Sequence, residues 1–150
     1  MSKALAEQTV LVTGSGRGLG SSIASAFARE GAKVVVNYRS SQAAAEELAE
    51  RLGDGVVALQ ADVQNADAVA EMVMQAQEKV GPITTVVHNA LADYSFNGDA
   101  RSTIDTLTSD EMLSQHHTAV LGALNVIQAT TPAMAEAGFG RIVTIGTNLV

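Results

Sequence analysis

Glycines dominate residues 13–20, where the sequence runs Thr-Gly-Ser-Gly-Arg-Gly-Leu-Gly. Glycine tolerates positive φ angles and carries no Cβ, so backbone amides in such a segment can come close to a diphosphate. A β-branched run, Thr9–Thr13, precedes the segment, and apolar residues at helical spacing follow it from Leu19. A helix that starts behind glycines also presents its positive N-terminal end to an anion. This context favours a phosphate-binding loop over the alternative, a tight turn without a ligand.

The residues that end the next β-branched run, Lys33–Asn37, bear on the kind of nucleotide. They are Asn37, Tyr38, Arg39 and Ser40. An acid at this place would accept hydrogen bonds from the 2′-hydroxyl of NAD, and none stands there. Arg17 and Arg39 can instead form charge-assisted contacts with a 2′-phosphate, which favours NADP(H). The alternative for both arginines is a solvated surface position.

Elements that would position these residues alternate along the chain. Short β-branched runs and helical patterns follow one another, which predicts βαβ units and an α/β, Rossmann-type, doubly wound parallel sheet in a single domain, residues 1–150. The expected strands are 9–13, 33–37, 56–60, 83–88 and 141–146. The expected helices are 19–31, 40–52, 65–80 and 108–134, with a long loop over 93–106. Ser40 and Ser41 are candidate caps of the second helix, and Thr108 and Glu111 have capping-box spacing for the fourth.

The composition excludes several classes of protein. Hydrophobic residues make up 47% and charged residues 17%, which suffices for a packed core. The formal net charge of −7 repels a polyphosphate backbone and argues against nucleic-acid binding. No cysteine is present for a disulfide or a thiolate metal site, and we expect no metal. With no apolar run near the length of a membrane span and no visible signal peptide, a cytoplasmic location is the expectation.

Further motifs follow the glycine segment in a fixed order. Asp62-Val63 comes after the third expected strand, His88-Asn89-Ala90-Leu91 after the fourth, and Gly122 lies in the long helix. Together with the T-G-x-x-x-G-x-G pattern, they resemble the short-chain dehydrogenase/reductase family, and most of all its bacterial 3-oxoacyl-acyl-carrier-protein reductases. The resemblance implies that Asp62 contacts adenine. The full set of expected cofactor-binding residues is Gly14, Ser15, Arg17, Gly18, Leu19, Gly20, Asn37, Tyr38, Arg39, Ser40, Asp62, Val63, Asn89, Ala90 and Leu91.

Activity is also implied by the resemblance, as NADP(H)-dependent reduction of a carbonyl, such as a 3-oxoacyl thioester, to a secondary alcohol. The catalytic Ser of the family corresponds to Thr147, and its helix Asn to Ala119. The family's Tyr-x-x-x-Lys pair has no counterpart, because Gln42 and Gly98 stand four residues after the two tyrosines. We therefore expect the N-terminal portion of such an enzyme, inactive as a 150-residue chain. The alternatives are a catalytically silent nucleotide-binding module and a fragment without a role of its own.

The expected partners are a small carbonyl or acyl-carrier-linked substrate and a second copy of the chain, bound through the long helix 108–134. Three polar sites keep structural alternatives. Asp62 can be a helix-entry cap, and His88 can be a packing residue rather than a backbone partner near the cofactor. His116 and His117 point about 100° apart on a helix, so a structural or surface role is favoured over metal binding.

Overall fold

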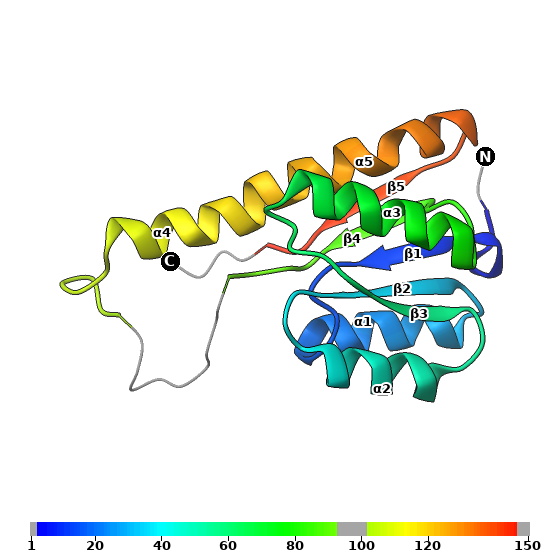
Figure 1. Ribbon diagram of the computed structural model, residues 1–150, viewed down its shortest axis with the longest axis horizontal. Helices are drawn as coiled ribbons and strands as arrows, with labels where there is room; N and C mark the ends of the chain where they lie inside the picture. Colours follow the sequence, from blue (N-terminus) through cyan, green and yellow to red (C-terminus); the bar gives the residue numbers. More distant parts are fainter. Residues whose placement is uncertain (1–2, 93–101, 147–150) are drawn as a thin grey trace.

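Five strands form one parallel sheet in the computed structural model, which describes residues 3–92 and 102–146 (Figure 1). Their order across the sheet is β3-β2-β1-β4-β5, and each neighbouring pair is parallel. The strands are β1 (Thr9–Val12), β2 (Lys33–Tyr38), β3 (Val56–Gln60), β4 (Thr85–His88) and β5 (Arg141–Thr144). The chain crosses from one half of the sheet to the other beside β1. The carboxyl ends of β1 and β4 therefore border the place where open α/β sheets bind ligands.

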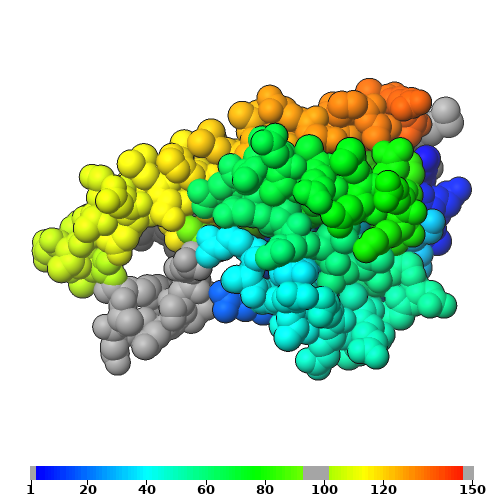
Figure 2. Space-filling view, viewed as in Figure 1, coloured from blue at the N-terminus to red at the C-terminus, as the bar shows by residue number. Residues whose placement is uncertain are grey.

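Helices cover the sheet from two sides, which confirms the Rossmann-type α/β fold. Figure 1 shows α1 and α2 on one side and α3 and α5 on the other. In the space-filling view the green surface of α3 lies against the orange surface of α5 (Figure 2). The helical elements are η1 (Leu5–Glu7), α1 (Gly18–Arg29), α2 (Gln42–Leu52), α3 (Ala66–Val80), α4 (Ser109–His116), the π-helical segment η3 (His117–Leu121) and α5 (Gly122–Glu136).

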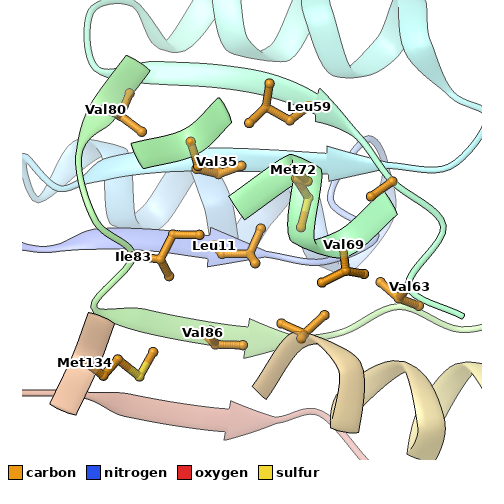
Figure 3. Close-up of a cluster of buried hydrophobic side chains, with 13 residues drawn as sticks. Leu11, Val35, Leu59, Val63, Val69, Met72, Val80, Ile83, Val86 and Met134 are labelled. Atoms are coloured by element: carbon orange, nitrogen blue, oxygen red, sulfur yellow. The ribbon is translucent and has the colours of Figure 1, made fainter. Parts of the chain in front are cut away.

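Side chains of the central strands alternate between two apolar clusters. Val10 and Val12 of β1 join the cluster under α1 and α2, whereas Leu11 joins the cluster under α3 and α5. Figure 3 shows Leu11 and Val86 of neighbouring strands in this second cluster, near Met72 of α3. Both faces of these strands are buried, which explains why the strands are continuous apolar runs rather than alternating ones.

The long helix expected over 108–134 is present, but it is not uniform. Thr108 and Glu111 form the predicted capping box, with Glu111 N donating to Thr108 Oγ1 at 3.2 Å and Thr108 N donating to Glu111 Oε2 at 2.8 Å. Hydrogen bonds from the hydroxyl of Ser102, and then from Thr108, hold the pKa of Glu111 below its usual value. The helix changes to π geometry at His117–Leu121 and ends at Glu136. Apolar spacing did not predict the π segment, because the segment depends on contacts with residues far away in the sequence.

The caps of α2 and α3 agree with the sequence prediction only in part. Ser41 occupies the cap position of α2, but neither its hydroxyl nor that of Ser40 makes a capping hydrogen bond. The cap of α3 is Asn65, whose Oδ1 accepts from Asp67 N at 3.0 Å and Ala68 N at 3.1 Å. Asp62 is not the helix cap; its Oδ1 accepts from Gln64 N at 2.9 Å in the turn before the helix. Within the described ranges, no helix is long and apolar enough to cross a membrane.

Candidate nucleotide-binding site

The loop between β1 and α1 is closed by glycines that no other residue can replace without a shift. Gly14 has φ +62°, and a Cβ there would lie 2.9 Å from Ala90 Cα. A Cβ on Gly20 would lie 2.6 Å from Gly14 O and 2.7 Å from Asn89 Nδ2. The start of α1, the loop and the turn after β4 thus touch through bare backbone. Gly18 differs, since it has φ +59° and a Cβ would meet nothing within 4 Å.

The first amides of α1 are available to a ligand. Among the described residues, the amides of Gly18, Leu19 and Gly20 donate no hydrogen bond. Arg17 is the N-cap, and its side chain makes no capping hydrogen bond. The side chain of Leu19 is 59% exposed, so it does not cover the helix end. Three free donors and the helix dipole together fit a phosphate group.

Earlier amides of the loop are already used, and the residue that uses them is Asn37. Gly14 N donates to Asn37 Oδ1 at 3.2 Å, and Ser15 N donates to Asn37 O at 2.8 Å. The Asn37 amide group donates in turn to Ala61 O at 3.1 Å. Asn37 is 1% exposed, so it supports the loop from the interior of the protein. Among the described residues, the amides of Gly14 and Ser15 thus have acceptors, whereas those of Gly18, Leu19 and Gly20 have none.

Two other predicted site residues are also buried. Ser15 is fully buried, and its hydroxyl donates to Val12 O at 2.6 Å. Tyr38 is 6% exposed and packs in the cluster under α1 and α2. Burial, and secondarily the charge of Glu46, raises the pKa of Tyr38. Arg39 and Ser40 are exposed at the end of β2, as is Arg17 at the start of α1.

The turn after β4 is tied to the loop by one hydroxyl and one amide group. Asn89 N and Ala90 N donate to Thr13 Oγ1 at 2.9 and 3.1 Å. Asn89 Nδ2 donates to Thr13 O at 3.2 Å and to Gly14 O at 3.3 Å. Leu91 follows with a side chain that is 57% exposed. Sequence reasoning missed Thr13 as a site residue, although its place before the first glycine at the end of β1 was the available signal.

Asp62 and Val63 lie at the carboxyl end of β3, and Asp62 is partly exposed. Val63 is 4% exposed and receives the closest approach of α5, since a Cβ on Gly122 would lie 2.7 Å from Val63 Cγ2. Asn125 Nδ2 donates to Val63 O at 2.9 Å. Val63 therefore packs against α5, and Asp62 is the partly exposed carboxylate beside it.

Thr147, the predicted catalytic residue, lies outside the described residues. A hollow of about 630 Å³ lies between α3 and α5 and is lined by apolar residues that include Val73, Met74 and Ala133. It contains none of the residues of the β1–α1 loop. We place the candidate site at the loop because, within the part of the chain that the structure describes, the amides of Gly18, Leu19 and Gly20 donate no hydrogen bond there.

The sequence of this chain is similar to those of a known protein family. The model of the short chain dehydrogenase family matches residues 8–149. Ketoacyl reductase HetN of Nostoc sp. is 37% identical over 145 residues, which cover 95% of this chain and 48% of that protein. The 3-oxoacyl-[acyl-carrier-protein] reductase MabA of Mycobacterium avium is 32% identical over 144 residues, covering 96% of this chain and 51% of that protein.

A solved structure has a similar fold. It is the gluconate 5-dehydrogenase of Burkholderia cenocepacia in complex with NADP and tartrate, with a TM-score of 0.79 and 29% identity. The match covers 93% of this chain and 53% of that chain. This chain thus spans about half the length of each of these three relatives.

Proposed function

Because this chain belongs to the short-chain dehydrogenase/reductase family, we propose that it binds NADP(H) at the β1–α1 loop as the cofactor-binding part of an oxidoreductase. The observation that carries the proposal is that the amides of Gly18, Leu19 and Gly20, at the positive end of α1, have no acceptor among the described residues. These donors would hold the pyrophosphate, and the bare surface of Gly18 lets the phosphate approach. Gly14 and Gly20 keep the loop closed, while Ser15 and Asn37 hold its anchored side.

Arginine chemistry supports NADP(H) over NAD(H). Arg17 is exposed at the start of α1, and Arg39 is exposed after the end of β2. The 2′-phosphate would lie between these guanidinium groups and the hydroxyl of Ser40. Asn37 and Tyr38 bring no carboxylate that would repel it.

The remaining cofactor contacts follow from the family resemblance. Asp62 would accept a hydrogen bond from the adenine amino group, with Val63 beside it. Asn89, Ala90 and Leu91 would border the ribose on the nicotinamide side. When bound, the cofactor supplies hydride to a carbonyl carbon.

For the reaction, we propose reduction of a carbonyl such as a 3-oxoacyl thioester, in line with the names of two relatives. The hydroxyl of Thr147 would steady the substrate oxygen. These 150 residues hold no Tyr-x-x-x-Lys pair to donate the proton, so we expect no NADPH-dependent turnover of a 3-oxoacyl thioester by this chain. Measurable turnover by the purified chain would contradict that expectation.

A catalytically silent nucleotide-binding module is the second candidate. Ala119 in place of the family's helix Asn favours it, because a methyl group cannot relay a proton. A turnover assay on a longer form of the protein, where one exists, separates the two functions. We also propose a cytoplasmic, homo-oligomeric protein that associates through the exposed apolar face of the long helix, which carries Leu113, Val120 and Leu124.

Calorimetric titration tests the proposed function. We expect NADPH to bind more tightly than NADH, and Arg39→Ala to remove most of that preference, with a loss of about tenfold for NADPH alone. Arg29→Ala is the matched control, because Arg29 is an exposed arginine in the last turn of α1, at the end opposite the β1–α1 loop. Equal loss in both variants would reveal a nonspecific charge effect. Absence of binding by either coenzyme to the folded chain would refute the proposal.

A further inference from the structure

His88 ends β4 and lies between the nucleotide loop and the long helix. It is 3% exposed, although its ring has two polar atoms. Nδ1 lies 3.1 Å from Thr13 Oγ1, and Nε2 lies 3.2 Å from Thr118 O. The ring thus joins the end of β1 to the π-helical segment.

The partners of His88 fix where every hydrogen must be. Thr118 O only accepts, so Nε2 carries the ring hydrogen and donates it. In the neutral ring Nδ1 is then an acceptor, and the Thr13 hydroxyl donates to it. That hydroxyl has two lone pairs left, and the amides of Asn89 and Ala90 occupy them. The hydrogen bonds therefore follow one direction. The amides of the turn after β4 donate to Thr13, Thr13 donates to His88, and His88 donates to the helix.

Thr118 is the point at which the π-helical segment is attached to the sheet. Its hydroxyl donates to Ser114 O at 3.1 Å and accepts from Gln64 Nε2 at 2.8 Å. Four residues on, Gly122 lies so close that a Cβ would be 3.5 Å from His88 Cε1. His88 and Gln64 therefore hold the same helical turn, but of the two only His88 also reaches Thr13.

We propose that His88 is a positioning residue that, as a neutral imidazole with its hydrogen on Nε2, sets the geometry of the nucleotide loop and of the π-helical segment together. The part of this inference that concerns the loop rests on the proposed function, because it requires that cofactor binding at the loop changes the long helix. Glycine-loop contacts and helix contacts are then linked through one ring rather than through the sheet alone.

Protonation of the ring would break the arrangement. A second ring hydrogen, on Nδ1, would face a Thr13 hydroxyl whose lone pairs already accept two amides. The hydroxyl would also lose the acceptor of its own hydrogen. Burial lowers the pKa of His88, while the hydrogen bond to the Thr118 carbonyl acts in the opposite direction, and the net lowering agrees with a ring that stays neutral.

The tautomer is the first test and needs no cofactor. Nitrogen-15 NMR of the histidine rings in the full chain at pH 7.5 distinguishes protonated from unprotonated ring nitrogens. We expect His88 to show a hydrogen on Nε2 and none on Nδ1. A hydrogen on Nδ1, or on both nitrogens, overturns the inference whether or not the protein binds NADPH.

Two substitutions remove the contacts of His88 with Thr13 and with Thr118 one at a time. An asparagine amide reaches about as far as Nδ1 of a histidine ring, and a glutamine amide about as far as Nε2. His88→Asn should therefore keep the contact with Thr13 and release the helix, whereas His88→Gln should do the reverse. In the free protein we expect hydrogen exchange at Asn89 and Ala90 to speed up about tenfold in His88→Gln only, as for loss of one buried hydrogen bond.

Coupling to the cofactor is the last readout, with Gln64→Ala as the matched control. In the wild type, NADPH should slow exchange of the amides at Leu121 and Gly122 as well as those of the loop. Both His88 variants should lose the helix response, and Gln64→Ala should keep it, since Gln64 does not touch Thr13. A helix response that survives in both His88 variants, or that disappears in Gln64→Ala, overturns the inference. Failure of NADPH to bind the wild type instead refutes the proposed function, and the tautomer and free-protein exchange then decide this inference alone.

Discussion

Two strands of the same length, β1 and β5, lie in opposite environments of one sheet. Every residue of β1 is buried, and every residue of β5 is exposed. β1 pairs with β2 and β4 and has a cluster on each face, whereas β5 pairs with β4 alone among the described strands. The loop that follows β1 is therefore built on a rigid base. The end of β5, which leads to the predicted catalytic residue Thr147, has less support among the described residues, so the proposed cofactor site and the predicted catalytic residue follow strands in different environments.

Truncation of a central side chain should show this contrast most strongly. Leu11 is fully buried, and Leu11→Ala should lower the free energy of unfolding by about 3 kcal/mol. Val143 is 46% exposed, and Val143→Ala should change it by less than about 0.5 kcal/mol. Urea unfolding followed by circular dichroism measures both. Similar losses for the two variants would mean that β5 is as well packed as β1.

An alanine at Gly14 should damage both stability and binding. Its positive φ and the contact with Ala90 Cα should together cost about 2–3 kcal/mol, and NADPH binding should be lost. Gly53→Ala is the control, because Gly53 also has a positive φ, of 83°, but open space around the added methyl. That control should cost about 1–2 kcal/mol and leave binding intact. Loss of binding in the control would show that any destabilisation suffices.

At the β5 edge of the sheet, a charged substitution should reduce self-association with little change in stability. Ile142 is 44% exposed on β5, and we expect concentration-dependent self-association through this strand or the long helix. Ile142→Lys should reduce association in sedimentation velocity runs and change the free energy of unfolding by less than about 0.5 kcal/mol. A wild-type chain that stays monomeric at high concentration would remove the basis for this prediction.

Stability should depend weakly on pH through His88. Burial lowers its pKa in the folded chain, so the unfolded chain takes up the proton more readily as the pH falls below the usual value of 6.5. Its contribution to the free energy of unfolding is therefore full above that pH and declines below it. Thr13 and Thr118, its hydrogen-bond partners, do not titrate. Unfolding at pH 5.5 and 7.5 should show a smaller difference in His88→Asn than in the wild type, and an equal difference would contradict this.

The sequence predicted the fold well because its signals are local. Continuous valine runs place all five strands to within two residues at each end, and the apolar period of 65–80 matches α3. The capping box at Thr108 was also correct. The π-helical segment was missed because it depends on contacts of Thr118 and Gly122 with residues far away in the sequence.

Prediction of the site was less complete, for the same physical reason. Spacing identifies Gly14 and Gly20 because glycine is needed where backbones touch, and Gly18 because its φ is positive. Spacing does not tell which side chains point inward, and Asn37 proved to be a buried anchor of the loop. The link through Thr13 and His88 joins two strand ends 75 residues apart, which periodicity alone cannot detect.

We propose that the amides at the start of α1 bind the pyrophosphate of NADP(H). An amide-resolved NMR titration of the chain with NADPH tests it most directly. We predict the largest downfield shifts at the amides of Gly18, Leu19 and Gly20, with small changes at Gly14 and Ser15, whose hydrogens already have partners. Saturable binding with no shift at residues 18–20, or with its main shifts in the hollow between α3 and α5, would contradict the claim.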